Sequence, residues 1–167
     1  VDQWLRSFAV QNLGGIGDNY STHGSGAWHN AMFYIRPTDG RAMYFPWDMD
    51  FTFTNSATSG VTPSTDLNKL IGIGPQYERA YYGHLLDIIE SAFNSDYMTP
   101  WLRHYSEFLD ENLNGYSGYI RSRSSHVRRL VENAVSKVSF KVKVPLEAPT
   151  EFSFCFDYLE QKHLFDH

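Results

Sequence analysis

Two carboxylates, Asp48 and Asp50, stand two residues apart in a stretch that is otherwise aromatic or apolar. In an extended segment, positions i and i+2 point to the same side, so both aspartates are predicted to project together, away from Trp47, Met49 and Phe51. Two like charges on a largely buried stretch are costly unless a cation compensates them, and Mg²⁺ prefers carboxylate oxygens. The pair therefore predicts a metal site. The structural alternative is a strand end whose aspartates are solvated or cap a turn.

Three further polar residues precede this pair. Asp18 lies in a loop after an expected helix, and His29 and Asn30 open the first strand of an expected hairpin. Phosphoryl transfer needs Mg²⁺ held by fixed oxygen ligands, and another carboxylate close to the attacking hydroxyl. Protein kinases present these parts in the order catalytic Asp, metal-binding Asn, metal-binding Asp. The order Asp18, Asn30, Asp48 is the same.

Apolar periodicity and turn signals predict the elements that would position these residues. The predicted fold is α+β and mostly helical, with helices over residues 2–13, 76–93, 98–113 and 117–135 and a β-hairpin of strands 31–36 and 41–47. The apolar stripes of the last three helices are expected to form core. Residues 54–66, rich in Thr, Ser, Gly and Pro, are predicted to be a loop.

The last long helix carries a basic cluster, Arg121, Arg123, Arg128 and Arg129. It is interpreted as a solvated helix face, with a phosphorylated or acidic partner as the alternative. Beyond residue 137 the pattern changes to alternation and predicts two strands. Residues 1–136 are accordingly assigned to one domain and 137–167 to a β-rich tail, interpreted as the start of a following module.

Composition narrows the classes of function. The chain has 167 residues, 42% of them hydrophobic and 16% aromatic, which is typical of a packed globular protein. Its net charge of −5 speaks against nucleic-acid binding as the main role, and no stretch approaches the roughly 20 apolar residues of a membrane span. The single Cys155 excludes an internal disulfide. Because the chain starts at Val1, already within a predicted helix, it is expected to be a fragment of a longer protein.

Residues 2 to about 136 resemble the C-terminal half of the CotH kinase family, the atypical kinases named for a spore-coat protein. The resemblance depends on Asp18-Asn19-Tyr20, on His29-Asn30 with Met32-Phe33-Tyr34, and on Pro46-Trp47-Asp48-Met49-Asp50. The segments Arg79-Ala80-Tyr81 to Ile88 and Tyr119 to Arg123 add to it. The resemblance implies a kinase-like C-terminal lobe in which the hairpin carries the metal-binding segment.

The resemblance also implies roles for single residues. Asp18 would be the catalytic carboxylate, Asp48 the main ligand of Mg²⁺ or Mn²⁺, and Asn30 and Asp50 supporting ligands. His29 would orient Asp18 or a phosphate of ATP, and the structural alternative for it is a histidine satisfied by local hydrogen bonds. The acceptor would be Ser or Thr of a surface or spore-coat protein, so an extracellular or spore-surface location is expected. No lysine precedes the metal segment, so the nucleotide-binding N-terminal lobe is expected elsewhere in the parent chain.

Two other classes of function fit parts of the sequence. A metal-dependent glycosyltransferase also ends a strand with paired aspartates on a divalent ion, although it would be expected to follow alternating strands and helices. A catalytically inactive surface or coat binding module would instead use the aromatic residues, and the test named for it is one exposed patch of Tyr20, Trp28 and Tyr34.

Overall fold

The computed structural model describes residues 1–21, 30–62, 64–135, 138–144 and 150–156. The chain divides into two compact units, Val1–Val131 and Glu132–His167. Up to residue 134 it is mostly helical with one two-stranded antiparallel sheet, which agrees with the predicted α+β class. The elements of this part are α1 (Asp2–Gly14), β1 (Ala31–Ile35), β2 (Ala42–Pro46), α2 (Thr65–Ile71), α3 (Pro75–Ser91), α4 (Ser95–Leu109), a 3₁₀ turn (Leu113–Gly115) and α5 (Tyr116–Ala134).

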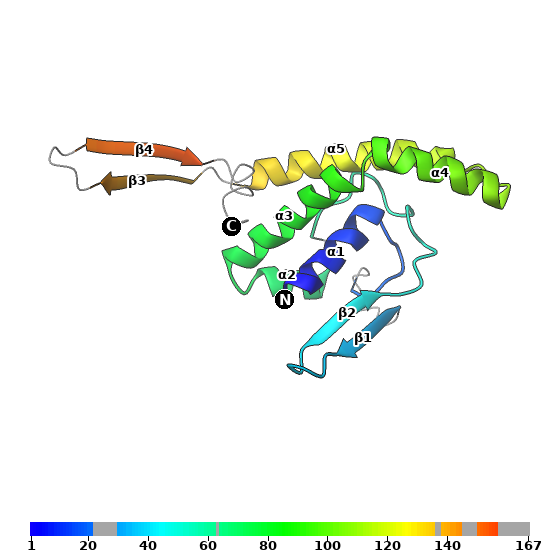
Figure 1. The fold of residues 1–167 in the computed structure, drawn as a ribbon, viewed down its shortest axis with the longest axis horizontal. Helices are drawn as coiled ribbons and strands as arrows, with labels where there is room; N and C mark the ends of the chain where they lie inside the picture. The colour runs from blue at the N-terminus through cyan, green and yellow to red at the C-terminus, as the bar shows by residue number, and fades with distance from the viewer. Residues whose placement is uncertain (22–29, 63, 136–137, 145–149, 157–167) are drawn as a thin grey trace. The chain divides into compact units, whose positions relative to one another are not determined.

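Helix α1 is the centre of the first unit and lies between the β1–β2 hairpin and α3 (Figure 1). Its predicted apolar stripe is buried through Leu5, Phe8, Ala9 and Leu13. Burying a large apolar side chain stabilises a fold by about 1.5–3 kcal/mol, so this stripe contributes much of the core. The helix ends at Gly15, whose φ of 57° is left-handed and suits glycine.

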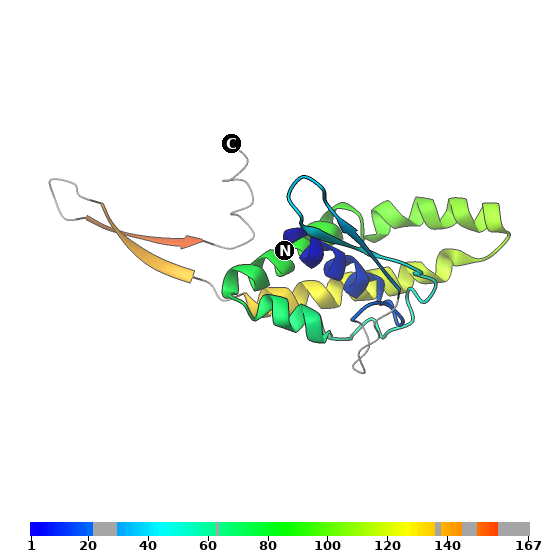
Figure 2. The ribbon, with the colours of Figure 1, turned by 90° about the horizontal axis from the view of Figure 1, so that it is seen from below.

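The hairpin lies beside α1 in Figure 1, and its strands pass in front of the helix in the view of Figure 2. Its register pairs Phe33 with Tyr44 and Met32 with Phe45. Because side chains alternate across a strand, Phe33 and Tyr44 share the face toward α1, and Met32 and Phe45 share the outer face. The turn is closed by the Gly40 amide, which donates to the Arg36 carbonyl at 2.8 Å.

The second unit contains the strands β3 (Val138–Val144) and β4 (Thr150–Phe156), which form an antiparallel pair. The register runs from Val138 opposite Phe156 to Val144 opposite Thr150. The alternation in the sequence therefore predicted both strands, with the second beginning somewhat earlier than expected.

One helix was not predicted, and one prediction about the helical part was wrong. Residues 54–62 of the predicted loop lie outside helices and strands, and the Ser64 hydroxyl then caps the unpredicted α2 by accepting from the Leu67 amide at 3.0 Å. The apolar stripe of α4 is not core: of its members only Leu102 is buried, whereas Trp101, Tyr105, Phe108 and Leu109 are exposed. Periodicity identifies an apolar face but not whether another element covers it.

No helix in the described ranges combines the length and the apolar character needed to cross a membrane.

Candidate functional site

The predicted site residues come from three segments around the hairpin. Asp18 is half-buried in the loop after α1, and Asn30 is half-buried directly before β1. Asp48 and Asp50 follow the end of β2 and are exposed. His29 lies outside the described residues.

Hydrogen bonds join these three segments to one another. The Asn30 side-chain amide donates to the Asp18 carbonyl at 2.7 Å. The Trp47 amide donates to the Asn30 carbonyl at 3.1 Å, so Asn30 links the Asp18 loop to the residue before Asp48. The structure therefore brings the Asp18 loop, Asn30 and the start of the aspartate pair together.

A cluster of buried polar side chains, Gln11, Asn19 and Tyr44, holds this junction in place. The Asn19 side chain, which is fully buried, donates from Nδ2 to the Trp47 carbonyl at 2.9 Å. Its Oδ1 accepts from the Tyr44 hydroxyl at 2.7 Å and from Gln11 Nε2, and Gln11 Nε2 also donates to the Tyr44 hydroxyl at 2.7 Å. Burial raises the pKa of the Tyr44 phenol, so the hydroxyl stays protonated and can donate. Gln11 Oε1 is buried with no hydrogen-bond partner among the described residues, whereas the other polar atoms named here are paired and hold the junction in one geometry.

The structural roles of Gln11 and Tyr44 were missed at the level of sequence. The available signal was Gln11 itself, a polar residue within the helix that carries the buried apolar stripe. A buried amide needs partners, so Gln11 pointed to a polar cluster under the Asp18 loop.

Tyr20 ties the same loop to α2. Its hydroxyl donates to Asp66 Oδ2 at 3.1 Å, and Lys69 Nζ lies 2.9 Å from Asp66 Oδ1. The bond from Lys69 is the main cause of a lowered Asp66 pKa, with the bond from Tyr20 contributing. Asp66 is therefore ionised at neutral pH, and Lys69 is held at a structural ion pair.

The geometry predicted for the aspartate pair was wrong. Strand β2 ends at Pro46, and Asp48 has a left-handed φ of 54°, a conformation that Asp adopts more readily than most residues. Asp48 and Asp50 are therefore not two positions of one extended strand, and the alternation argument does not apply to them. The neighbouring Trp47 is also exposed, by 56%.

The oxygen atoms of these side chains are of the chemical type that binds a hard cation. Carboxylate oxygens of Asp48 and Asp50 and the Asn30 Oδ1 are ligands that Mg²⁺ and Mn²⁺ accept. Within the described ranges, however, no three His, Cys, Asp or Glu side chains gather closely enough to hold one ion. Asp18 thus joins the other acids through main-chain and amide bonds rather than through a shared carboxylate cluster.

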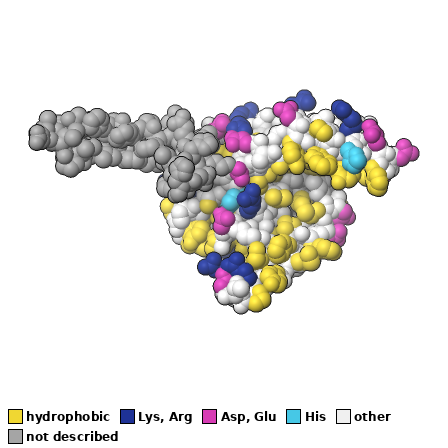
Figure 3. All heavy atoms as spheres, viewed as in Figure 1, with side chains coloured by type: hydrophobic (Ala, Val, Ile, Leu, Met, Phe, Trp, Pro, Cys, Tyr) yellow, Lys and Arg dark blue, Asp and Glu magenta, His cyan; other side chains and the backbone are white. Residues whose placement is uncertain are grey.

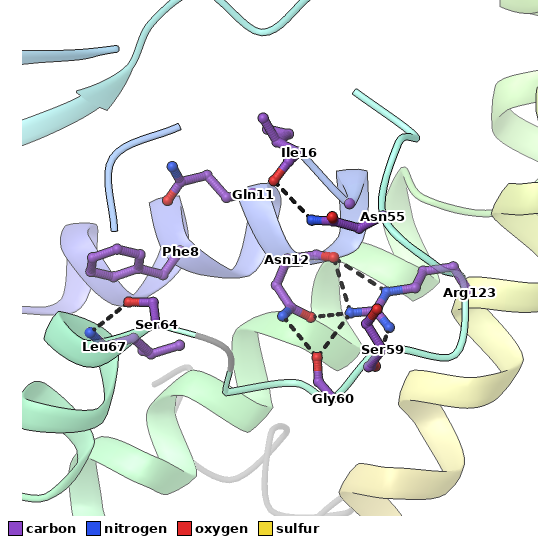
Figure 4. Close-up of a pocket in the computed structure, with 11 residues that line it drawn as sticks. Phe8, Gln11, Asn12, Ile16, Asn55, Ser59, Gly60, Ser64, Leu67 and Arg123 are labelled. Carbon is purple, nitrogen blue, oxygen red and sulfur yellow. Dashed lines mark hydrogen bonds between the residues drawn. The ribbon is translucent and has the colours of Figure 1, made fainter. Parts of the chain in front are cut away.

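A separate cavity of about 170 Å³ lies beside the C-terminal end of α1 and is lined in part by Arg123 (Figure 4). Only 1% of Arg123 is exposed, so its assignment to a solvated helix face was wrong. Its guanidinium donates to the Asn12 side chain at 2.7 Å, to the Asn12 carbonyl, and to the carbonyls of residues 57, 59 and 60. Burial lowers the pKa of this group. All three guanidinium nitrogens have hydrogen-bond partners, so Arg123 connects the loop of residues 57–60 to α1.

Comparison with known proteins leaves the family of this chain open. No family model matches it, and no solved structure matches it. The ribosomal protein uS12 methylthiotransferase RimO of Aquifex aeolicus (strain VF5) is 30% identical over 83 residues, which cover 46% of this chain and 19% of that protein. The chain thus spans less than a fifth of the length of this relative.

Proposed function

We propose that residues 2–136 form the C-terminal-lobe half-site of a CotH-like protein kinase, which transfers the γ-phosphoryl group of ATP to Ser or Thr of a surface or spore-coat protein. The observation that supports this most is the direct linkage of Asp18, Asn30 and Trp47, since the proposed catalytic and metal-binding residues lie at or beside those positions. The lobe is kinase-like in this proposal, and the hairpin presents its metal segment.

Each residue has a role in the proposed site. Asp18 accepts the proton of the attacking hydroxyl, Asp48 is the main ligand of Mg²⁺ or Mn²⁺, and Asn30 and Asp50 assist it. The Asn30 amide nitrogen is engaged by the Asp18 carbonyl, which leaves its Oδ1 on the other branch of the amide as a neutral ligand. His29 orients Asp18 or a phosphate. When bound, the cation neutralises the charge that develops on the transferred phosphate.

The outer face of the hairpin supports a partner lobe. Met32, Tyr34 and Phe45 are 45%, 50% and 40% exposed, and Trp47, which is 56% exposed, follows directly after β2. A two-stranded sheet is marginal alone and gains stability when such a face is covered. In this proposal the N-terminal lobe of the parent chain covers it and brings ATP to the metal segment.

The metal site can be tested on this chain alone. Mn²⁺ is added in small amounts to the ¹⁵N-labelled chain, and the broadening of amide signals is followed by NMR. The amides of residues 30, 48 and 50 are expected to broaden first, and Asp48→Ala is expected to abolish the effect there. The matched control is Asp110→Ala, an exposed acid on the far end of α4. Equal broadening in Asp48→Ala would remove the metal site.

Transfer is tested on the longer parent protein with γ-labelled ATP, Mg²⁺ and a Ser/Thr acceptor protein. Asp48→Ala should abolish the label, Asp18→Asn should lower the rate by about 10²–10⁴-fold, and Arg103→Gln on the surface of α4 should leave it unchanged. Transfer from a nucleotide sugar instead of ATP would favour the glycosyltransferase, for which the described part of the chain shows no alternation of strands and helices.

A binding module without catalysis is the second candidate, and the exposed apolar face of the hairpin favours it as well. Of the three aromatic residues expected in one patch, Tyr34 is exposed, whereas Tyr20 packs against Phe8, Phe33 and Tyr44, and Trp28 lies outside the described residues. Binding of nucleotide and metal by the parent without transfer would select this candidate.

A further inference from the structure

A wide groove of about 1170 Å³ lies between the C-terminal end of α3, the N-terminal end of α4 and the middle of α5. Its α5 wall carries Arg121, Arg128, Arg129 and His126, and its opposite wall carries Glu90 and Asp96. Figure 3 shows Lys and Arg side chains along the upper edge of the view, over α5 and α4, with Asp and Glu side chains among them. The groove shares no residue with the proposed kinase site, so an inference about it is independent of that site.

The charge of the groove differs from that of the molecule. The chain as a whole carries −5, yet three arginines face only two acids here. Arg128 pairs with Glu90 at 3.4 Å, and this pair is partly exposed. For Arg121 and Arg129, no carboxylate of the described residues lies within ion-pair distance. The wall thus presents positive charge that its own fold does not compensate.

The spacing of the arginines indicates the shape of a ligand. Seven or eight residues separate Arg121 from Arg128 and Arg129, which places them on one side of α5 about 10–12 Å apart along its axis. A strand advances about 3.3 Å per residue and alternates its side chains, so anionic side chains four residues apart lie on one face about 13 Å from each other. A single small anion reaches only one end of this row.

We propose that the groove docks an extended, acidic protein segment, with two carboxylates placed four residues apart on the arginine wall. The exposed hydroxyls of Ser122 and Ser125 lie between the arginines and offer further hydrogen bonds. A nucleic acid carries a charge at every nucleotide and meets Glu90 and Asp96 on the facing wall, whereas a peptide can place neutral residues opposite these two acids, so the groove favours a peptide.

The test is an NMR titration of the ¹⁵N-labelled chain in 50 mM salt with a ten-residue Gly/Ser peptide that holds two Glu four positions apart. Backbone amides of residues 121–129 and the Arg Nε–H signals are expected to shift and saturate. A matched peptide with Gln at both positions should bind at least about tenfold more weakly, and 300 mM salt should have a similar effect because it screens exposed charges.

The double variant Arg121→Gln/Arg129→Gln should lose about tenfold in affinity for the Glu peptide and keep the far-UV CD spectrum of the parent. Arg103→Gln, an exposed arginine of α4 outside the groove, should bind as the parent does. The proposal is overturned by absence of shifts with the Glu peptide, by equal binding of the Gln peptide, by an equal loss in Arg103→Gln, or by tighter binding of oligouridylate at the same residues.

Discussion

The two strands of the hairpin have similar apolar sequences but opposite surroundings. The backbone of Tyr44 in β2 is held from α1, since its amide donates to Gln3 Oε1 at 3.1 Å and its carbonyl accepts from the Ser7 hydroxyl at 3.2 Å. Trp4 Nε1 donates to the Ala42 carbonyl at 2.8 Å. In β1, all of residues 32–35 are exposed. Polar side chains of α1 thus decide which strand is anchored, and apolar alternation alone does not.

The strongest test of this contrast is Tyr44→Ala. Tyr44 is fully buried and its ring lies 5.3–5.8 Å from those of Trp4, Phe8, Tyr20 and Phe33. Removing it should lower the free energy of unfolding by about 3–5 kcal/mol, measured by urea denaturation. Tyr44→Phe keeps the ring and loses only the hydroxyl, so it should cost about 1–2 kcal/mol. Equal losses in the two variants would show that the ring packing is unimportant.

The variant Asn19→Ala tests the buried hydrogen bonds that hold the backbone next to the candidate site. It removes the donor to the Trp47 carbonyl and a partner of both Gln11 and Tyr44, so about 1–3 kcal/mol of stability should be lost. In the same variant the amide of Asp48 should show a changed chemical shift and faster hydrogen exchange. A loss of stability with no change at Asp48 would separate the buried cluster from the candidate site.

On the outer face, the double change Met32→Ser/Tyr34→Ser should alter the free energy of unfolding of this chain by no more than about 0.5 kcal/mol. Both side chains are about half exposed, so the folded chain gains little from them. The same change should weaken association with the N-terminal lobe in the parent protein. A loss above about 1.5 kcal/mol in this chain would mean that the face is already covered.

The smallest expected effect concerns the turn of the hairpin. The hydrogen bond from Arg36 holds the pKa of Asp39 at about 2, below the ordinary 3.8. A carboxyl with a lowered pKa stabilises the fold above about pH 4 and loses that contribution as the pH falls through about 2. A ¹³C titration of the Asp39 carboxyl should give this pKa, and Arg36→Gln should return it toward 3.8. An Asp39 pKa near 3.8 in the unaltered chain would contradict the hydrogen bond from Arg36.

Much of the fold could be predicted because its signals are local. The stripe of α1, the turn at residues 37–40 and the long helices α3 and α5 follow from periodicity and turn residues, and all are confirmed. The short helix α2 was missed because seven residues are too few for a periodic signal. The exposure of α4 depends on which elements face it, and no local pattern contains that information.

The site could be predicted only in part for the same reason. The order of Asp18, Asn30 and Asp48 was visible in the chain, and the bonds through Asn30 and Trp47 bring their segments together. The turn at Asp48 was not visible, because an aspartate after a strand can continue it or reverse it. Arg123 stands only two residues after the exposed Arg121 in a polar stretch, and only its position on α5 toward α1 and residues 57–60 buries it.

The bond from the Trp47 amide to the Asn30 carbonyl closes the base of the hairpin. The chain therefore enters and leaves the hairpin at one point, directly before Asp48, while side chains of α1 hold β2 farther along the strand. A shift of β2 against α1 would accordingly move the backbone that leads into this aspartate.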